Sequence, residues 1–143
     1  MVGEQGGSQS GGMSADDELA VRNLVARVAQ YADGPDVDAY VALFTSDALW
    51  DMPGAPRKGH AEIRAGSDER RAAGQIGPGS NTRHVVSTIA VRLHEDHAVA
   101  DSVWQFFVDT NTTPRLQLMG TYHDECRRVG DDWKLAHRQI TIG

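Results

Sequence analysis

Four long segments in the second half of the sequence limit most strongly what this chain can fold into. They span residues 82–94, 97–109, 115–129 and 133–142, and all are rich in β-branched and aromatic residues, which favour β-strands. The breaks between them are short, and a short break joins antiparallel neighbours because parallel strands need a long crossover. The second half of the chain is therefore predicted to form an antiparallel meander.

The segment before the meander has helical periodicity. Ser14 and Asp17 fit a capping box at the start of a helix. The apolar face of this helix comprises Val21, Leu24, Val25, Val28 and Ala32, with Tyr31 on the same side. Asp33-Gly34-Pro35 ends the helix, and Gly34 is expected in the left-handed cap conformation. A short helix is expected next, from Asp36, with Val37, Tyr40, Val41 and Phe44 on one side. It is followed by a strand over 48–52, a helix over 59–73 and a loop over 75–81.

Helices first and a long sheet after them indicate an α+β fold, with N-terminal helices packed across a strongly curved, mostly antiparallel sheet. Residues 1–13 hold five of the 15 glycines and little apolar content, so they are predicted to be a disordered tail. Residues 14–143 are the size of one domain.

Charge and composition disfavour several classes of protein. Acidic residues number 20 against 14 basic ones, and a net charge of -6 disfavours non-specific binding to nucleic acid or anionic membrane. No apolar stretch approaches the roughly 20 residues of a membrane helix, so a cytoplasmic protein is expected. The single cysteine, Cys126, excludes an intrachain disulfide. No metal site is expected, because neither the pair His94 and His97 nor His123 beside Asp124-Glu125 offers the required ligand set.

His84 is the first candidate for chemistry, since a curved sheet covered by helices leaves a cavity at its open end. It begins a strand directly after a Gly/Pro-rich loop, where a histidine can serve as a general acid or base. A strand-edge hydrogen bond is the alternative. Strict alternation places His84 with Val86, opposite the apolar face of Val85 and Ile89, unless a bulge near the strand start reverses the phase.

Asp33 and Arg138 are the other two candidates. Asp33 lies at a helix C-terminus, where the helix dipole disfavours a carboxylate, although Asp-Gly-Pro is also a common turn sequence. Arg138 lies between Ala136 and Ile140 on the last strand, and a buried arginine needs a partner, so a structural ion pair is the more ordinary explanation.

A series of short strings resembles the SnoaL-like family, within the nuclear-transport-factor-like superfamily of cone-shaped α+β barrels. In order, they are residues 33–40 (DGPDVDAY), residues 43–50 (LFTSDALW), Gly59 with Ile63, residues 82–84 (TRH), residues 120–124 (GTYHD), and residues 133–135 (WKL) leading to Arg138. The resemblance covers nearly everything after residue 13. It implies a cone-shaped barrel with an internal cavity.

Within that family the chain is similar to a lyase branch of dehydratases and a dehydrochlorinase. The resemblance implies that His84 and Asp33 form a His–Asp dyad with His84 facing the cavity, and that Trp50 and Arg138 belong to the active site. The branch usually carries a tyrosine or lysine five residues before the dyad aspartate. Here that position is Val28, and Tyr31 or Tyr122 are the candidates to replace the missing donor.

The resemblance implies a cofactor-independent lyase or isomerase that acts on a small, largely apolar, cyclic or polyketide-like molecule. A homodimer or homotrimer is expected, with no nucleic-acid or membrane partner, no cofactor and no metal. Two alternatives remain open at this point. One is an aldol-type polyketide cyclase, and the other is a non-catalytic ligand-binding module or accessory subunit.

Overall fold

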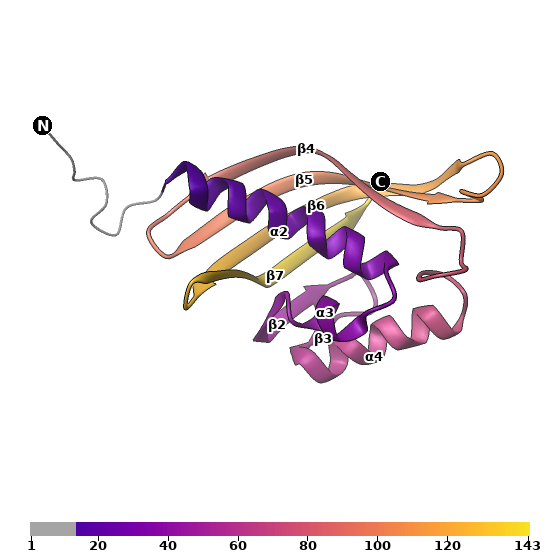
Figure 1. The fold of residues 1–143 in the computed structure, drawn as a ribbon, viewed down its shortest axis with the longest axis horizontal. Coiled ribbons are helices and arrows are strands. Elements are labelled where there is room, and N and C mark those ends of the chain that lie inside the picture. The colour runs from indigo at the N-terminus through magenta and orange to yellow at the C-terminus, as the bar shows by residue number, and fades with distance from the viewer. Residues whose placement is uncertain (1–13) are drawn as a thin grey trace, which may run out of the picture.

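The computed structural model describes residues 14–143, so the predicted disordered tail over residues 1–13 lies outside the described residues. Figure 1 shows helices packed against a long sheet, the predicted α+β arrangement. The elements in chain order are α2 (Ala15–Asp33), α3 (Val37–Val41), β2 (Phe44–Asp51), β3 (Arg57–Lys58), α4 (Gly59–Ala72), β4 (Arg83–Leu93), β5 (His97–Val108), β6 (Arg115–Val129) and β7 (Asp132–Ile142). Within the described residues, every helix is too short or too polar to cross a membrane.

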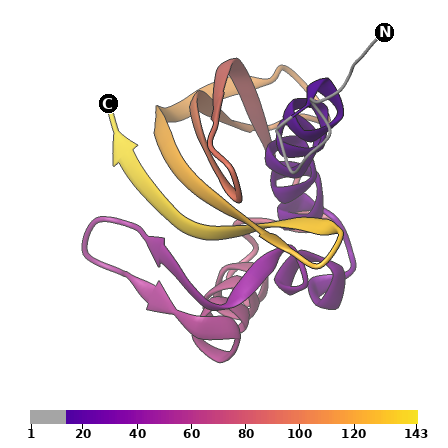
Figure 2. The ribbon, with the colours of Figure 1, turned by 90° about the vertical axis from the view of Figure 1, so that its left-hand side faces the viewer.

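The six strands form one sheet in the order β3-β2-β7-β6-β5-β4. Strands β4 to β7 pair antiparallel with their sequence neighbours, which confirms the predicted meander. Strand β2 pairs parallel with β7, and β3 pairs antiparallel with β2. The sheet curves strongly, as Figure 2 shows, and α2 lies across the concave face formed by β4 to β7.

Strand β2 begins earlier than the predicted strand over residues 48–52. Phe44, expected on one side of the short helix, is instead the first residue of β2 and pairs with Leu135 of β7. The preceding Leu43 already accepts a backbone hydrogen bond from Leu135 at 2.9 Å. The pairing with β7 therefore sets the start of this strand, which local sequence preference does not determine.

Helix α2 confirms the predicted cap and the predicted buried face. The Ser14 hydroxyl accepts from the Asp17 backbone N–H at 3.2 Å, and the Asp17 carboxylate accepts from the Ser14 backbone N–H at 3.1 Å. The five predicted apolar residues of this helix are all buried, and they are Val21, Leu24, Val25, Val28 and Ala32.

The expected left-handed conformation of Gly34 is wrong, since its φ and ψ of -87° and 178° are extended. The physical reason lies in Arg71 of α4. Its guanidinium donates to the backbone carbonyls of Tyr31, Ala32 and Gly34 at 3.1, 3.1 and 2.6 Å. These carbonyls are satisfied by a side chain, so the helix end does not need a glycine-dependent turn.

A β-bulge in β4 decides which way His84 points. Between the pairs Ser87–Val103 and Ala90–Asp101, β4 holds one residue more than β5, and Thr88 there has a positive φ of 45°. The extra residue reverses the phase, so His84 faces inward while Val85 is 40% exposed on the outer face. Strict alternation along residues 84–93 is therefore wrong.

Candidate active site

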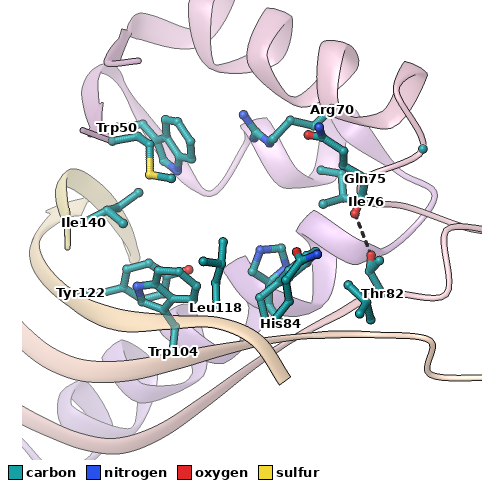
Figure 3. A pocket seen from close by; sticks show the side chains of 15 residues that line it. Trp50, Arg70, Gln75, Ile76, Thr82, His84, Trp104, Leu118, Tyr122 and Ile140 are labelled. Carbon is teal, nitrogen blue, oxygen red and sulfur yellow. Dashed lines mark hydrogen bonds between the residues drawn. The ribbon is translucent and has the colours of Figure 1, made fainter. Parts of the chain in front are cut away.

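The open end of the curved sheet holds a cavity of about 490 Å³, within the range of small-molecule sites. In Figure 3, Arg70 and Trp50 lie on one wall, and His84, Trp104 and Tyr122 lie on the opposite wall. The residues around it are Trp50, Met52, Arg70, Gly74, Gln75, Ile76, Thr82, His84, Trp104, Phe106, Val108, Gln117, Leu118, Tyr122 and Ile140. The lining within the described part of the chain is thus mainly apolar, and it contains no Asp or Glu side chain.

His84 and Asp33 meet at the edge of this cavity, where the end of α2 lies beside the start of β4. The Asp33 Oδ1 atom lies 2.8 Å from Nδ1 of the His84 ring, and Oδ2 accepts from the His84 backbone N–H at 2.8 Å. Because an ionised carboxylate can only accept, Nδ1 carries a hydrogen, and in the neutral ring Nε2 keeps its lone pair. The ring rests on Phe106, with centroids 4.8 Å apart.

This pair is sheltered but still reachable. The exposed fractions of the His84 and Asp33 side chains are 20% and 14%. Both oxygens of Asp33 are occupied by the same residue, so the carboxylate fixes the position of the His84 backbone as well as the orientation of the ring. The arrangement can hold one imidazole tautomer in place and stabilise the imidazolium formed when Nε2 takes a proton.

Arg138 has the buried partner that its position on β7 requires. Its Nε and Nη2 atoms donate to the two carboxylate oxygens of Asp124 at 2.8 and 2.9 Å, and both side chains are buried. Burial by itself would lower the pKa of Arg138, but the attraction of Asp124 outweighs it, so the pKa lies above its usual range. The guanidinium is therefore a permanent charge in a structural ion pair.

A narrow recess of about 40 Å³ lies beside the cavity and brings Arg138 close to His84. The Arg138 guanidinium lies over the ring of Tyr122, 3.6 Å from its centroid, and Tyr40 forms another part of the wall. Burial raises the pKa of Tyr122 to about 12, and burial also raises the pKa of Tyr40. Both phenols therefore remain protonated at neutral pH and can donate hydrogen bonds.

The structure brings most of the predicted site residues together. Trp50 lines both the cavity and the recess, and Val28 lines the recess without contributing a donor. Tyr122 lies in both as well. Tyr31 is not among the lining residues of either one; it packs against the main core, and its hydroxyl accepts from Arg27 Nη1 at 3.1 Å.

Several lining residues were absent from the predicted site. Arg70 lies seven residues after Ile63 on α4, so helical periodicity places it on the same inward face and was a usable signal. Trp104 and Phe106 alternate with outward residues along β5, but nothing local distinguishes them from ordinary core residues. Tyr40 was expected only as a packing residue of the short helix.

The remaining histidine candidates lie away from this site. His94 and His97 stack on each other at the turn between β4 and β5, with ring centroids 4.6 Å apart. Over residues 14–143, no group of three or more His, Cys, Asp or Glu side chains is arranged to hold a metal ion.

The fold and its cavity define a cone-shaped α+β protein with the His84–Asp33 pair at the cavity edge. The chain belongs to the SnoaL-like family, since the SnoaL-like domain matches residues 13–139. No match was found among curated proteins.

Solved structures with the same fold come from several bacteria. A protein of unknown function with a cystatin-like fold from Nostoc punctiforme is 25% identical, with a TM-score of 0.81, and the match covers 92% of this chain and 94% of that chain. The ActVI-ORFA protein of Streptomyces coelicolor is 22% identical, with a TM-score of 0.74 and coverage of 87% and 96%. A candidate scytalone dehydratase from Novosphingobium aromaticivorans is 18% identical, with a TM-score of 0.68 and coverage of 90% and 85%.

Proposed function

We propose that this protein is a cofactor-independent lyase or isomerase, of the dehydratase kind, in which His84 and Asp33 act as a general acid–base dyad. The observation that carries the proposal is the 2.8 Å contact between Asp33 Oδ1 and His84 Nδ1 at the edge of an apolar cavity. The substrate is a small, largely apolar, cyclic or polyketide-like ketone, because most of the lining is apolar or aromatic.

The first step is removal of a proton from the carbon next to the substrate carbonyl. His84 Nε2 accepts this proton, and the electrons of the C–H bond move into the carbonyl to form an enolate oxygen. Asp33 keeps Nδ1 protonated and stabilises the imidazolium. Trp50 packs on the apolar body of the substrate.

The second step expels a hydroxyl group from the neighbouring carbon. The enolate carbonyl re-forms, the C–O bond breaks, and the proton held by His84 leaves with the hydroxyl as water. Tyr122 and Tyr40 support the enolate oxygen with hydrogen bonds, because the raised pKa of each phenol keeps it protonated. Arg138, whose charge is balanced by Asp124, packs on the ring of Tyr122 and positions it. Tyr122 thereby replaces the donor missing at Val28.

The comparisons support this class of chemistry. The SnoaL-like family match covers most of the chain, and one neighbour of the same fold is a candidate scytalone dehydratase.

The experiment measures conversion of 3-hydroxy-1-tetralone to 1-naphthol, a dehydration that can be followed by absorbance and by the mass of the product. Replacing His84 with Ala should lower turnover by about 100- to 10,000-fold, the usual contribution of a general base. His94→Ala is the matched control, because His94 stacks on His97 away from the cavity and should leave turnover unchanged. Equal turnover by the wild type and the His84→Ala variant would contradict the role of the dyad.

The aldol-type polyketide cyclase is the second candidate, and the same site favours it because cyclisation also begins with an enolate. The two reactions differ in the hydroxyl group, which a cyclase retains in the product and a dehydratase releases as water. A linear β-polyketone that gives a cyclic product of unchanged mass would assign the cyclase reaction.

The third candidate is a ligand-binding or accessory subunit, and the outer face of the sheet favours it. Val85 and Met119 face outward there, opposite the cavity, and are 40% and 42% exposed. We propose that this apolar face meets a second copy in a homodimer or homotrimer. If His84→Ala changes ligand affinity or assembly and no chemistry is found, the binding role is the correct one.

A further inference from the structure

Arg70 is a charged side chain in the cavity whose charge has no partner. Among residues 14–143 its guanidinium makes no hydrogen bond and no ion pair, yet it lines both the cavity and the recess. Its main contact is the face of Trp50, with 4.6 Å between the guanidinium carbon and the ring centroid. Figure 3 shows this side chain extending from α4 toward Trp50.

The neighbouring arginines on α4 are engaged differently. Arg71 is held by the backbone carbonyls at the end of α2 and by Ser67. Arg64 pairs with Asp38 at 2.6 Å on the exposed side of the helix. Arg70 is thus the arginine of this helix whose donors remain available to a molecule in the cavity.

Among the described residues, Arg70 is the cation of the cavity lining whose charge is not balanced by an ion pair. Arg138 is neutralised by Asp124, and the carboxylate of Asp33, at the cavity edge, is held by His84. The described cavity lining contains no carboxylate, although the chain as a whole carries a net charge of -6. Arg57 lies beside Arg70, since its Nε and the Nη1 of Arg70 both lie against Gly66, within 3.2 and 3.1 Å of where a Cβ would be, but the charge of Arg57 is balanced by Glu69 at 2.7 Å. A half-buried guanidinium without an ion-pair partner is costly, so an anion in the cavity would be stabilised.

We propose that Arg70 binds a carboxylate on the substrate, and that the substrate is therefore a cyclic, largely apolar carboxylic acid. This inference rests on the proposed function for the reacting end of the molecule, which it extends to the opposite end. A planar guanidinium matches the two oxygens of a carboxylate, and its stacking on Trp50 holds the fork in place. The carboxylate lies against the α4 wall, and the apolar rings extend toward His84 on the opposite wall.

The test compares equilibrium binding of 2-naphthoate with that of 2-naphthamide, which has similar shape and no charge, by calorimetry at neutral pH. The wild type should bind the acid about tenfold to a hundredfold more tightly than the amide, as expected for a charge-assisted hydrogen-bonded pair. Arg70→Met keeps a flexible, unbranched apolar stem but removes the charge, and it should abolish the preference for the acid without weakening binding of the amide. Arg64→Gln removes a charge from the same helix and should keep the preference.

Thermal unfolding checks that the variant is folded. Arg70→Met should unfold close to the wild-type temperature, because Arg70 has no ion pair to lose among the described residues and methionine can still pack on Trp50. Equal affinity of the wild type for acid and amide, including no binding of either, would overturn the proposal. A preference retained by Arg70→Met would overturn it as well.

The carboxylate site and the proposed reaction are tested separately, because the binding experiment does not require turnover. An acid preference that depends on Arg70, with no dehydration of 3-hydroxy-1-tetralone, would remove only the proposed reaction. Dehydration that depends on His84, with no acid preference, would remove only the carboxylate site.

Discussion

Asp124 shows what a single residue contributes when it has no access to solvent. Its carboxylate is fully buried and holds Arg138, which lies directly across from it in the pairing of β6 with β7. Sequence reasoning established that a buried Arg138 needs a partner. It did not identify Asp124, because the register between two strands decides which residues are opposite.

Replacing Asp124 with Asn should destabilise the fold by about 3–5 kcal/mol, because the variant leaves an uncompensated charge in the core. The measurement is the free energy of unfolding in urea. Asp38→Asn is the control, since Asp38 pairs with Arg64 at the surface and should cost at most about 1 kcal/mol. A similar small loss in both variants would show that the buried pair does not stabilise the protein.

At the scale of the element, the bulge in β4 determines whether His84 faces the candidate site. Residues 89–93 are anchored in the core by Ile89, Val91 and Leu93, and the extra residue near Thr88 sets the phase of everything before it. Alternation along the sequence implies that a bulge would reverse the direction of His84. Its position could not be predicted, because neither Ser87-Thr88 nor its neighbours form a recognisable bulge sequence.

Deleting Val86, which lies between His84 and the bulge, should shift residues 83–85 by one position, so that Val85 takes the inward place of Val86 and His84 points outward. The variant should lose tetralone dehydration to the same extent as His84→Ala, with a lower unfolding temperature. Thr88→Gly is the matched change, because it alters the bulge without removing a residue. Because the φ of Thr88 is 45°, glycine there should preserve turnover and should not lower stability. Full turnover in the deletion variant would mean that the phase of this strand does not orient His84.

At the scale of the whole molecule, the core and the cavity wall each contain a buried acidic group that stays protonated in the folded protein. Cys126 lies in the main core beneath α2, and Tyr122 lies in the smaller cluster beside the cavity. Burial raises the pKa of Cys126 from 9.0 to about 12 and that of Tyr122 from 10.0 to about 12. The folded protein therefore keeps these protons over a pH range in which the unfolded chain releases them.

The stabilisation that these two groups contribute should consequently be complete below about pH 9 and should fall as the pH rises toward 12. The loss is about 1.4 kcal/mol per pH unit for each group, once the pH exceeds the pKa of that group in the unfolded chain. Between pH 9 and 11 the contribution of Cys126 amounts to about 2 kcal/mol. Cys126→Ala should show a correspondingly shallower decline in unfolding free energy, apart from a constant offset for the smaller side chain. Identical declines in the two proteins would indicate that the thiol does not control alkaline stability.

Local patterns determined the elements of this protein. The capping box at Ser14, the apolar face of α2, the helix at α4 and the four-strand meander all follow from side-chain spacing and short connections, which act between near neighbours. Resemblance to the SnoaL-like family added the cone-shaped form, joined His84 and Asp33 in a dyad, and added Trp50 to the candidate residues.

Tertiary structure alone decided how those residues meet. The parallel pairing of β2 with β7, the bulge that turns His84 inward, the use of Arg71 at the end of α2 and the isolation of Arg70 all involve residues far apart in the sequence. No local preference encodes such contacts, because the register of strands and the packing of helices on them are settled by the burial of the whole core.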